Sequence, residues 1–518
     1  MTLRTSAVGS LFLLFTLTLV AGCGSSPSAP ASNPASNPAS QISNPAPLSA
    51  ANVNLVFVAS EDLAHSAAGD INPSTANLTS QGLQRSLGMA TFLQQDVLGM
   101  QNVAQIYALE PMTHLQTANN YPDMVGLETV QQFAMLNQVN MSSDLSGGTP
   151  YLGQSFPINV SYAAVPLPNG VVPVTPSTAC PNCRGLDFND EQSDNETLVQ
   201  GIVKANAAGS YVFSAPWETV SALLTNINNL ENYNLTLPTS YTSPNLIYAI
   251  SITPQGSASL ATFNSQVNPA STYPVLTPAP PSSSCTAQTQ FKVTVTGGQN
   301  GAVIPAGANT NETLYFIRHA DAHPMTYWDN NNYVGAGQWR ALDLPNTPLG
   351  NINPTQVYSI DPAQYSIGSL LYLSNDSVSP TMDHNWSTVA PALTAEPYAI
   401  AKGVPYNLVT SFELNANTPA DLQTTAQNTS NFFFTGGQFS NQTVVVAWAF
   451  QFMQPTIDAL LTSYNASSQQ INQVATWPPT DYDTIWTVQL DSSGNVTVSN
   501  GMCEGINSNL LPAEPPQF

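Results

Sequence analysis

The amino-acid sequence predicts an α/β protein built from two tandem, doubly wound α/β/α units. Three observations lead to this prediction. The chain has 518 residues, more than a single hydrophobic core usually serves. Short, continuous apolar segments alternate with segments of helical periodicity, as in sheets of mainly parallel strands. Segments of the first part of the chain also recur in the same order in the second part.

The internal repeat rests on pairs of similar segments that keep one order. The offset between paired segments changes only from 259 residues (314 − 55) to 237 residues (457 − 220). One match of this length carries little weight, but matches in one order at a nearly constant offset indicate a duplication. The pairs are Leu55–Val58 with Leu314–Ile317, Gly82–Leu87 with Gly337–Leu342, Asn102–Pro111 with Asn353–Pro362, Val220–Leu224 with Ile457–Leu461, and Ile247–Ile252 with Ile485–Leu490.

Each unit is expected to begin with a buried strand, followed by a loop and a helix. In the first unit, Leu83, Leu87, Ala90 and Val97 recur on one face at helical spacing. A short strand, a long excursion rich in Pro and Asn, a strand that runs into a helix, and a closing strand complete the unit. The later elements are expected at Gln105–Leu109 and Gln356–Ile360, at Val444–Ala447 with the helix Thr456–Leu461, and at Ile247–Ile252 and Ile485–Leu490.

The segment between the units is expected to be rich in β structure. Thr and Val alternate in Phe291–Thr296, and Gly297 and Gly298 follow, which predicts a strand pair with a turn. The sequence thus divides into a signal peptide (1–22), a flexible tether of Ser, Pro, Asn and Ala (23–50), a first domain (51–258), a small β-rich connecting segment (259–310) and a second domain (311–518).

The N-terminus has the features of an export signal. Arg4 precedes an apolar run, Leu11–Val20, that is too short to span a bilayer comfortably. Val20–Cys23 resembles the bacterial lipobox, in which the cysteine becomes lipidated. The resemblance implies attachment to a membrane through a lipid on Cys23, in the bacterial cell envelope on the extracytoplasmic side. The next residue, Gly24, favours the outer membrane. The alternative is an ordinary cleaved signal peptide with a chance cysteine.

Four cysteines remain after the signal peptide and Cys23. An even number in an oxidising compartment predicts two disulfides. Cys180 and Cys183 are expected to form a loop staple, because they lie among Pro, Asn and Asp rather than at the strand-to-helix turn of a redox motif. A single CxxC is weak support for zinc. By elimination, Cys285 and Cys503 would pair and tie the C-terminal tail to the start of the second unit.

The composition excludes some classes of partner. Charged residues make up 8% of the chain, and the net charge is -23. A nucleic-acid-binding protein needs clustered Lys and Arg, whereas the 8 Lys and Arg residues of this chain are scattered singly. Nucleic acid and anionic membrane surfaces are therefore not expected to be partners.

The second unit opens with the apolar segment Leu314–Ile317, followed by Arg318 and His319. An apolar strand that ends in Arg-His resembles the signature of the histidine phosphatase (phosphoglycerate mutase-like) superfamily. The resemblance extends along the second unit and, more faintly, along the first. It implies two units of histidine-phosphatase type, with His319 as the nucleophile and Arg318 as the phosphate-binding residue. It also implies a phosphorylated small molecule as ligand, and neither a cofactor nor a metal.

The chain departs from the family pattern at the helper residues. The family has a second Arg and a second His, but this sequence has no Arg after residue 340 and no His after residue 384. Phe450 stands where the second His is expected, and Ala390 where the second Arg is expected. The first unit has Ala59–Ser60 in place of Arg-His. The sequence therefore predicts a catalytically degenerate binding or scaffolding lipoprotein; the alternative is an active extracytoplasmic phosphomonoesterase that uses His319.

Two further hypotheses stay open. His319, Asp321 and His323 alternate and would share one face of an extended backbone, where they could ligate a metal. Arg85 and Arg340 occupy matching helix positions, which favours a surface or interface role for both. Substitute helper residues could instead restore catalysis, and the candidates are His384, Lys402, His65, His114, Arg85 and Arg184.

Overall fold

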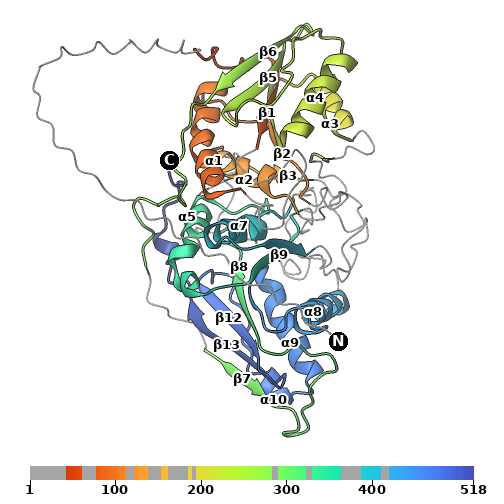
Figure 1. Ribbon diagram of the computed structural model, residues 1–518, viewed down its shortest axis with the longest axis vertical. Helices are drawn as coiled ribbons and strands as arrows, with labels where there is room; N and C mark the ends of the chain where they lie inside the picture. The colour runs from red at the N-terminus through yellow and green to blue at the C-terminus, as the bar shows by residue number, and fades with distance from the viewer. Residues whose placement is uncertain are drawn as a thin grey trace, which may run out of the picture. The chain divides into compact units, whose positions relative to one another are not determined.

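The computed structural model has a mixed α/β fold with two mixed sheets (Figure 1). This confirms the predicted α/β class. Residues 44–518 form one compact unit. The structure describes residues 43–60, 78–111, 122–137, 153, 155–160, 185–188, 194–282, 290–322, 330–362, 387–409 and 419–518.

The first sheet has the strand order β3-β2-β4-β1-β5-β6. The four strands from β3 to β1 are parallel. β5 pairs antiparallel with β1, and β6 pairs antiparallel with β5. We call the part of the chain that carries this sheet the first half. Its strands are β1 (Val53–Ala59), β2 (Gln105–Ala108), β3 (Ile158–Asn159), β4 (Gly209–Ala215), β5 (Leu246–Ile252) and β6 (Ala258–Asn264).

The second sheet repeats this arrangement with one strand added. Its order is β10-β9-β11-β8-β12-β13-β7, again with four parallel strands followed by antiparallel ones. We call the part of the chain from β7 onward the second half. Its strands are β7 (Lys292–Val295), β8 (Glu312–Arg318), β9 (Gln356–Ile360), β10 (Tyr406–Val409), β11 (Thr443–Trp448), β12 (Thr484–Leu490) and β13 (Val496–Cys503).

The two sheets also share their pairing register. In the first half Leu55 pairs with Ile250, and in the second half Leu314 pairs with Val488. The offsets are 259 (314 − 55) and 238 (488 − 250), the same as those of the sequence matches for these strands. The segments paired in the sequence therefore lie on equivalent strands.

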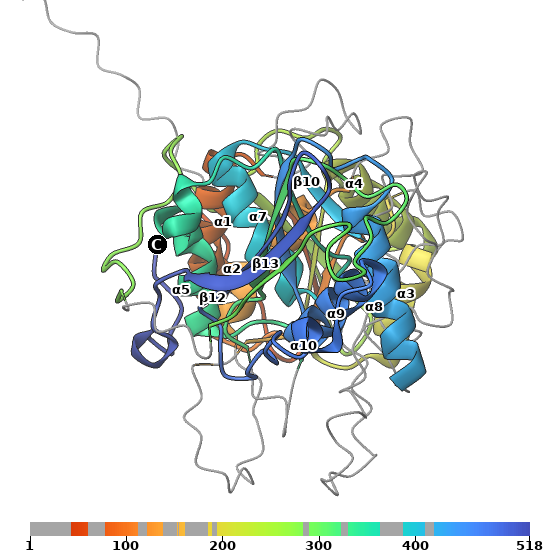
Figure 2. The same cartoon turned by 90° about the horizontal axis from the view of Figure 1, so that it is seen from below.

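Helices cover both faces of each sheet. In Figure 2, α3, α4, α8 and α9 lie on the side opposite to α1, α2, α5 and α7. The helices are α1 (Ser80–Phe92), α2 (Val125–Leu136), α3 (Asp194–Ala205), α4 (Trp217–Leu230), α5 (Gly335–Asp343), α7 (Ala390–Lys402), α8 (Pro419–Phe434), α9 (Met453–Ser463) and α10 (Ser468–Ile471). Short π and 3-10 segments are η2 (Leu93–Val97), η4 (Leu344–Asn346), η5 (Pro348–Asn351), η6 (Phe450–Phe452) and η7 (Ser508–Leu510).

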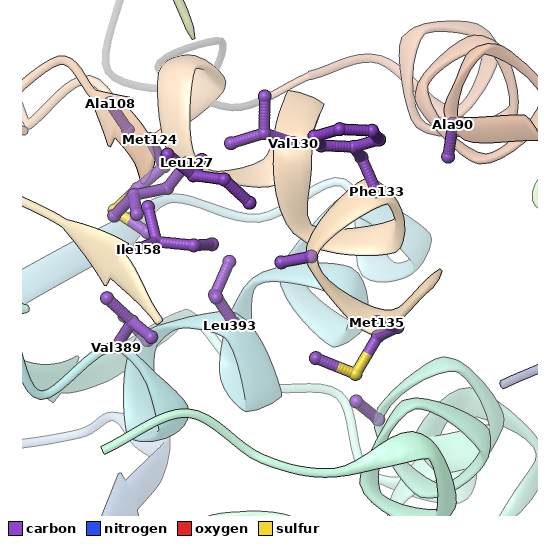
Figure 3. Packing of buried hydrophobic residues seen from close by; sticks show 14 of the residues in the cluster. Ala90, Ala108, Met124, Leu127, Val130, Phe133, Met135, Ile158, Val389 and Leu393 are labelled. Atoms are coloured by element: carbon purple, nitrogen blue, oxygen red, sulfur yellow. The ribbon is translucent and has the colours of Figure 1, made fainter. Parts of the chain in front are cut away.

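Alternation along the strands divides the hydrophobic core. In β1, Leu55 and Phe57 face a core that belongs to the first half, with α3 and α4. Val56 and Val58 face the opposite way, into a core to which the second half also contributes. Figure 3 shows this shared core, where Leu127 of α2 and Ile158 of β3 lie on the side of Leu393 of α7. We call the region where α1 and α2 meet α5 and α7 the junction.

The junction also contains direct hydrogen bonds between the halves. Gln131 and Asn332 exchange amide hydrogen bonds of 3.0 and 3.3 Å, and Gln338 donates to Gln132 at 3.0 Å. The two halves are therefore joined by apolar packing and by neutral polar contacts between side chains far apart in the sequence.

The connecting segment 259–310 contains the predicted β structure, but the local strand pair predicted there is wrong in the described residues. β6, which begins at the predicted boundary, pairs along its whole length with β5 and so belongs to the first sheet. β7 pairs with β13 and belongs to the second sheet. Alternating Thr and Val residues predict a strand but not its partner, which here lies about two hundred residues later in the chain.

Candidate functional site

β8 delivers the Arg-His pair to the edge of the second sheet where ligands of α/β proteins bind. Arg318 is the last residue of β8, and β9 and β11 run parallel to it, so all three strands end at this edge. α7 holds the following turn, because the Thr394 hydroxyl accepts a 2.8 Å hydrogen bond from the Ala320 amide. The position expected for Arg318 and His319 at a strand end is therefore observed.

His319 is held as a neutral imidazole. Its Nδ1 lies 2.9 Å from the Ala320 carbonyl oxygen, which can only accept, so Nδ1 carries the proton and Nε2 keeps its lone pair. Burial and, to a smaller extent, the Arg318 charge lower the pKa of His319 to about 3. The ring is thus in the tautomer that a nucleophile or a hydrogen-bond acceptor needs.

Arg318 is engaged by the protein itself. Its side chain is 2% exposed, and its guanidinium lies between the rings of Phe450, at 4.1 Å, and Tyr482, at 3.7 Å. Its Nη1 donates to the carbonyl oxygens of Pro479 and Asp481, in the loop before β12. Stacking on both faces and two carbonyl acceptors fix this guanidinium as a support for the loop.

The expected helper positions hold apolar side chains. Phe450 begins η6 after β11 and is the ring that covers Arg318. Ala390 opens α7 and is 4% exposed. In the described part of the chain, the groups that act on His319 are Arg318, Asp321, the Ala320 carbonyl and the edge of the Tyr482 ring. No second Lys or Arg reaches His319 within these residues.

Of the two roles predicted for Arg340, at the surface or at an interface, the surface role is wrong, because the residue is buried. It is fully buried in α5 and donates from Nε to Asp321 at 2.5 Å and from Nη1 to Glu504 at 2.6 Å. Nη2 donates to Ser508 at 2.8 Å and to the Ile506 carbonyl at 3.2 Å. Arg340 therefore ties the ends of β8 and β13 to α5.

The ionisable groups of this network shift one another's pKa values. Burial acts against the charged form of Arg340, but the carboxylates of Asp321 and Glu504 hold its pKa above the usual value. Burial raises the pKa of Glu504 to about 8, although Arg340 opposes the shift. Close approach of α5 makes the network possible: a Cβ at Gly337 would lie 2.7 Å from the Cβ of Tyr333 and would meet the Asp321 carbonyl oxygen.

The metal hypothesis finds no support in the described residues. Asp321 bonds Arg340, and His323 lies outside the described residues. No group of three His, Cys, Asp or Glu side chains that could hold a metal occurs in the part of the chain that the structure describes.

A polar cavity of about 260 Å³ lies at the same edge of the sheet, beyond Tyr482. The carboxylates of Asp481 and Asp483 face it together with hydroxyl and amide groups, and none of its lining residues is Lys or Arg. Such a lining suits a neutral or cationic ligand better than a phosphate. The lining residues are Thr480, Asp481, Tyr482, Asp483, Thr484, Cys503, Ile506, Asn507, Ser508 and Asn509.

At the equivalent edge of the first half, β1 ends at Ala59, and Ser60 follows in place of His319. The cavity that the described residues form beside Ser60 measures about 10 Å³. Arg85 lines this cavity, is partly buried, and donates to Asn245 and, at 2.8 Å, to the Val267 carbonyl. A cavity of this size holds at most one water molecule.

The remaining site predictions fall partly outside the described residues. Lys402 ends α7 and donates to the Gly350 carbonyl at 2.5 Å. Cys503 is buried at the end of β13 and is disulfide-bonded, while its predicted pairing with Cys285 stays a prediction. The predicted residues outside the described ranges are Cys23, His65, His114, Cys180, Cys183, Arg184, Cys285, His323 and His384.

Comparison of the sequence with models of known protein families and with curated proteins finds no match. In the part of the chain that the structure describes, no helix combines the length and the apolar character that crossing a membrane requires.

Proposed function

We propose that this chain is a catalytically inactive, histidine-phosphatase-like lipoprotein of the bacterial envelope that binds or scaffolds a partner. The observation that carries the proposal is the state of Arg318. A phosphate-binding arginine must present its donors to a ligand, whereas this guanidinium is stacked between two rings and bonded to two backbone carbonyls.

The assignment to the histidine phosphatases is supported by topology and by the placement of one motif. Each half has four parallel strands with helices on both faces, and Arg-His ends the central strand β8. The proposed domains are 51–258 and 311–518, with the first extended through β6 and the second preceded by β7.

The expected loss of catalysis follows from the rate factors that the missing catalytic groups would supply. Removing a positioned general acid or base costs ~10²–10⁴ in rate. Removing a donor to the transition-state charge costs a further ~10²–10³. Phe450 replaces the expected acid or base, Ala390 replaces the expected donor, and Arg318 is engaged elsewhere. Phosphoryl transfer depends almost wholly on such stabilisation, so no useful rate is expected.

The alternative is an active phosphomonoesterase, and one observation favours it. His319 has the neutral tautomer with a free lone pair on Nε2, which is the state that attacks phosphorus.

Purified chain beginning at Gly24 is expected to hydrolyse a generic phosphomonoester no faster than the variant His319→Ala. Single turnovers with a large excess of protein would detect a slow phosphohistidine intermediate. Turnover by the unchanged chain that disappears in His319→Ala, while both proteins unfold at the same temperature, would refute the inactive assignment and establish the phosphatase.

Membrane attachment through Cys23 is a separate prediction. Because a lipidated cysteine is the only proposed anchor, Cys23→Ser is expected to move the protein from the membrane fraction to the soluble fraction of a producing bacterium. Metabolic labelling with a fatty-acid analogue checks the same point. A Cys23→Ser protein that stays in the membrane fraction would exclude the lipid anchor.

A further inference from the structure

Two carboxyl side chains meet inside the junction, one from each half. Glu128 lies in the first turn of α2 and Glu396 in the middle of α7, with exposed fractions of 2% and 0%. Their side chains hydrogen-bond to each other. Two carboxyl groups can form such a bond only when one of them carries a proton. The pair therefore shares a proton between the two halves.

Within the described residues, no positive charge compensates this pair. Neither oxygen of Glu396 accepts a hydrogen bond there. The groups of the described chain that interact with the pair are one further carboxyl and three tyrosines, and no Lys or Arg is among them. They are Asp123 before α2, Tyr273 after β6, Tyr333 before α5 and Tyr406 of β10.

The two carboxyls differ in how firmly they hold a proton. Burial raises the pKa of Glu128 to about 7, although the hydrogen bond from Glu396 lowers it. Burial, followed by the Glu128 charge, holds the pKa of Glu396 well above its usual range. Glu396 is thus the donor and Glu128 the acceptor, and the N-terminal turn of α2 favours the charge on Glu128.

We propose that Glu128 and Glu396 form a proton-operated latch between the two halves. The halves stay joined at α2 and α7 while the pair holds a proton, and opening of the junction releases that proton into water. The amide pairs of the junction, Gln131 with Asn332 and Gln132 with Gln338, do not titrate. Acidic media therefore favour the joined form, and alkaline media favour opening. This inference does not depend on the proposed function.

The direction of this pH dependence follows from the number of protons that the joined and the open forms hold. In the open form, hydrated carboxyls lose their protons near their ordinary values of about 4.5, so above this pH only the joined form holds protons. Between about pH 4.5 and 7 the joined form holds two, and above about pH 7 it holds one. Each further pH unit then favours opening about tenfold.

Hydrogen exchange of the whole chain measures this opening. After correction for intrinsic exchange rates, exchange in α2 and α7 is expected to rise about tenfold per pH unit above about pH 7, for as long as Glu396 keeps its proton. α4 and α9 pack in cores that belong to one half each, so their exchange is expected to change little. In Glu396→Gln, the amide donates to Glu128 permanently, and the pH dependence in α2 and α7 should disappear.

Glu312→Gln is the matched control. Glu312 is also buried and has a pKa raised by burial to about 8, but it lies at the start of β8 and bonds Asn309. This variant should keep the pH dependence of the unchanged chain. If Glu396→Gln does not fold, Glu396→Met tests the same point, because it also removes the carboxyl that holds the proton above about pH 7. Flat exchange in the unchanged chain, an equal rise in α4 and α9, or an unaltered rise in the Glu396 variants would overturn the latch.

Discussion

Replacing Arg340 by alanine is expected to lower the free energy of unfolding by about 3–5 kcal/mol, because breaking a buried ion pair leaves charges without compensation. The guanidinium is fully buried and engages Asp321, Glu504 and Ser508. Its removal leaves two carboxyl groups in a low-dielectric site and also opens a cavity. Urea denaturation followed by tryptophan fluorescence measures the loss.

The effect should depend on pH in a defined direction. Burial raises the pKa of Glu504 to about 8 although Arg340 opposes the shift, so without Arg340 this pKa rises further and the folded chain must hold a proton on Glu504 at higher pH. The loss of stability is therefore expected to be smaller near pH 7 than near pH 9. A loss of equal size at both pH values would show that packing rather than charge is responsible.

Arg85 supplies the control for Arg340. It occupies the matching helix position in the first half, is partly exposed, and bonds an amide oxygen and a backbone carbonyl. Arg85→Ala is expected to cost about 1 kcal/mol, within the range for a neutral acceptor near the surface. Equal losses for the two alanine variants would contradict the central role of the Arg340 network.

Replacing Arg318 by alanine is expected to lower the free energy of unfolding by about 2–4 kcal/mol, from the loss of two charged hydrogen bonds and two ring contacts. This prediction separates two roles for the residue. An arginine that waits in an open site for a ligand contributes little to stability, and its removal often leaves stability unchanged or improved.

Arg318→Lys adds a second comparison. Lysine keeps the charge but not the planar group that stacks between Phe450 and Tyr482, so most of the loss is expected to remain. Lys204, exposed on α3 and bonded to Gln200, serves as a surface control whose alanine variant should unfold as the unchanged chain does. If Arg318→Ala is as stable as the unchanged chain, its assignment as a support for the loop fails.

The sequence predicts the strands well because their signals are local and occur twice. Apolar runs such as Leu55–Val58 and Leu314–Ile317 need no distant partner to be recognised, and the observed register reproduces their offset. The position of His319 at a strand end follows from the same signal. The partner of a strand is not encoded locally. The pattern of β7 therefore predicts a strand but not its place at the edge of the second sheet.

The buried charges could not be predicted in this way. Arg340 and Arg85 occupy matching positions, yet Arg340 is buried against Glu504 and Ser508, more than 160 residues later, while Arg85 is partly exposed beside a cavity of about 10 Å³. Glu128 and Glu396 come from different halves, and the sequence of neither helix predicts that the two carboxyl groups meet. The signal that was available is composition: a chain with so few cations cannot pair every buried carboxyl.

The shared core means that the two halves are not separate domains in the usual sense. Such a domain has its own core and tolerates the loss of its neighbour. Here apolar side chains such as Leu127 of α2 and Leu393 of α7 belong to one buried cluster, so deletion of the first half would expose apolar side chains of the second. Each half therefore covers one face of the other, as the subunits of an obligate dimer do, and substitutions on that face are constrained by both halves at once.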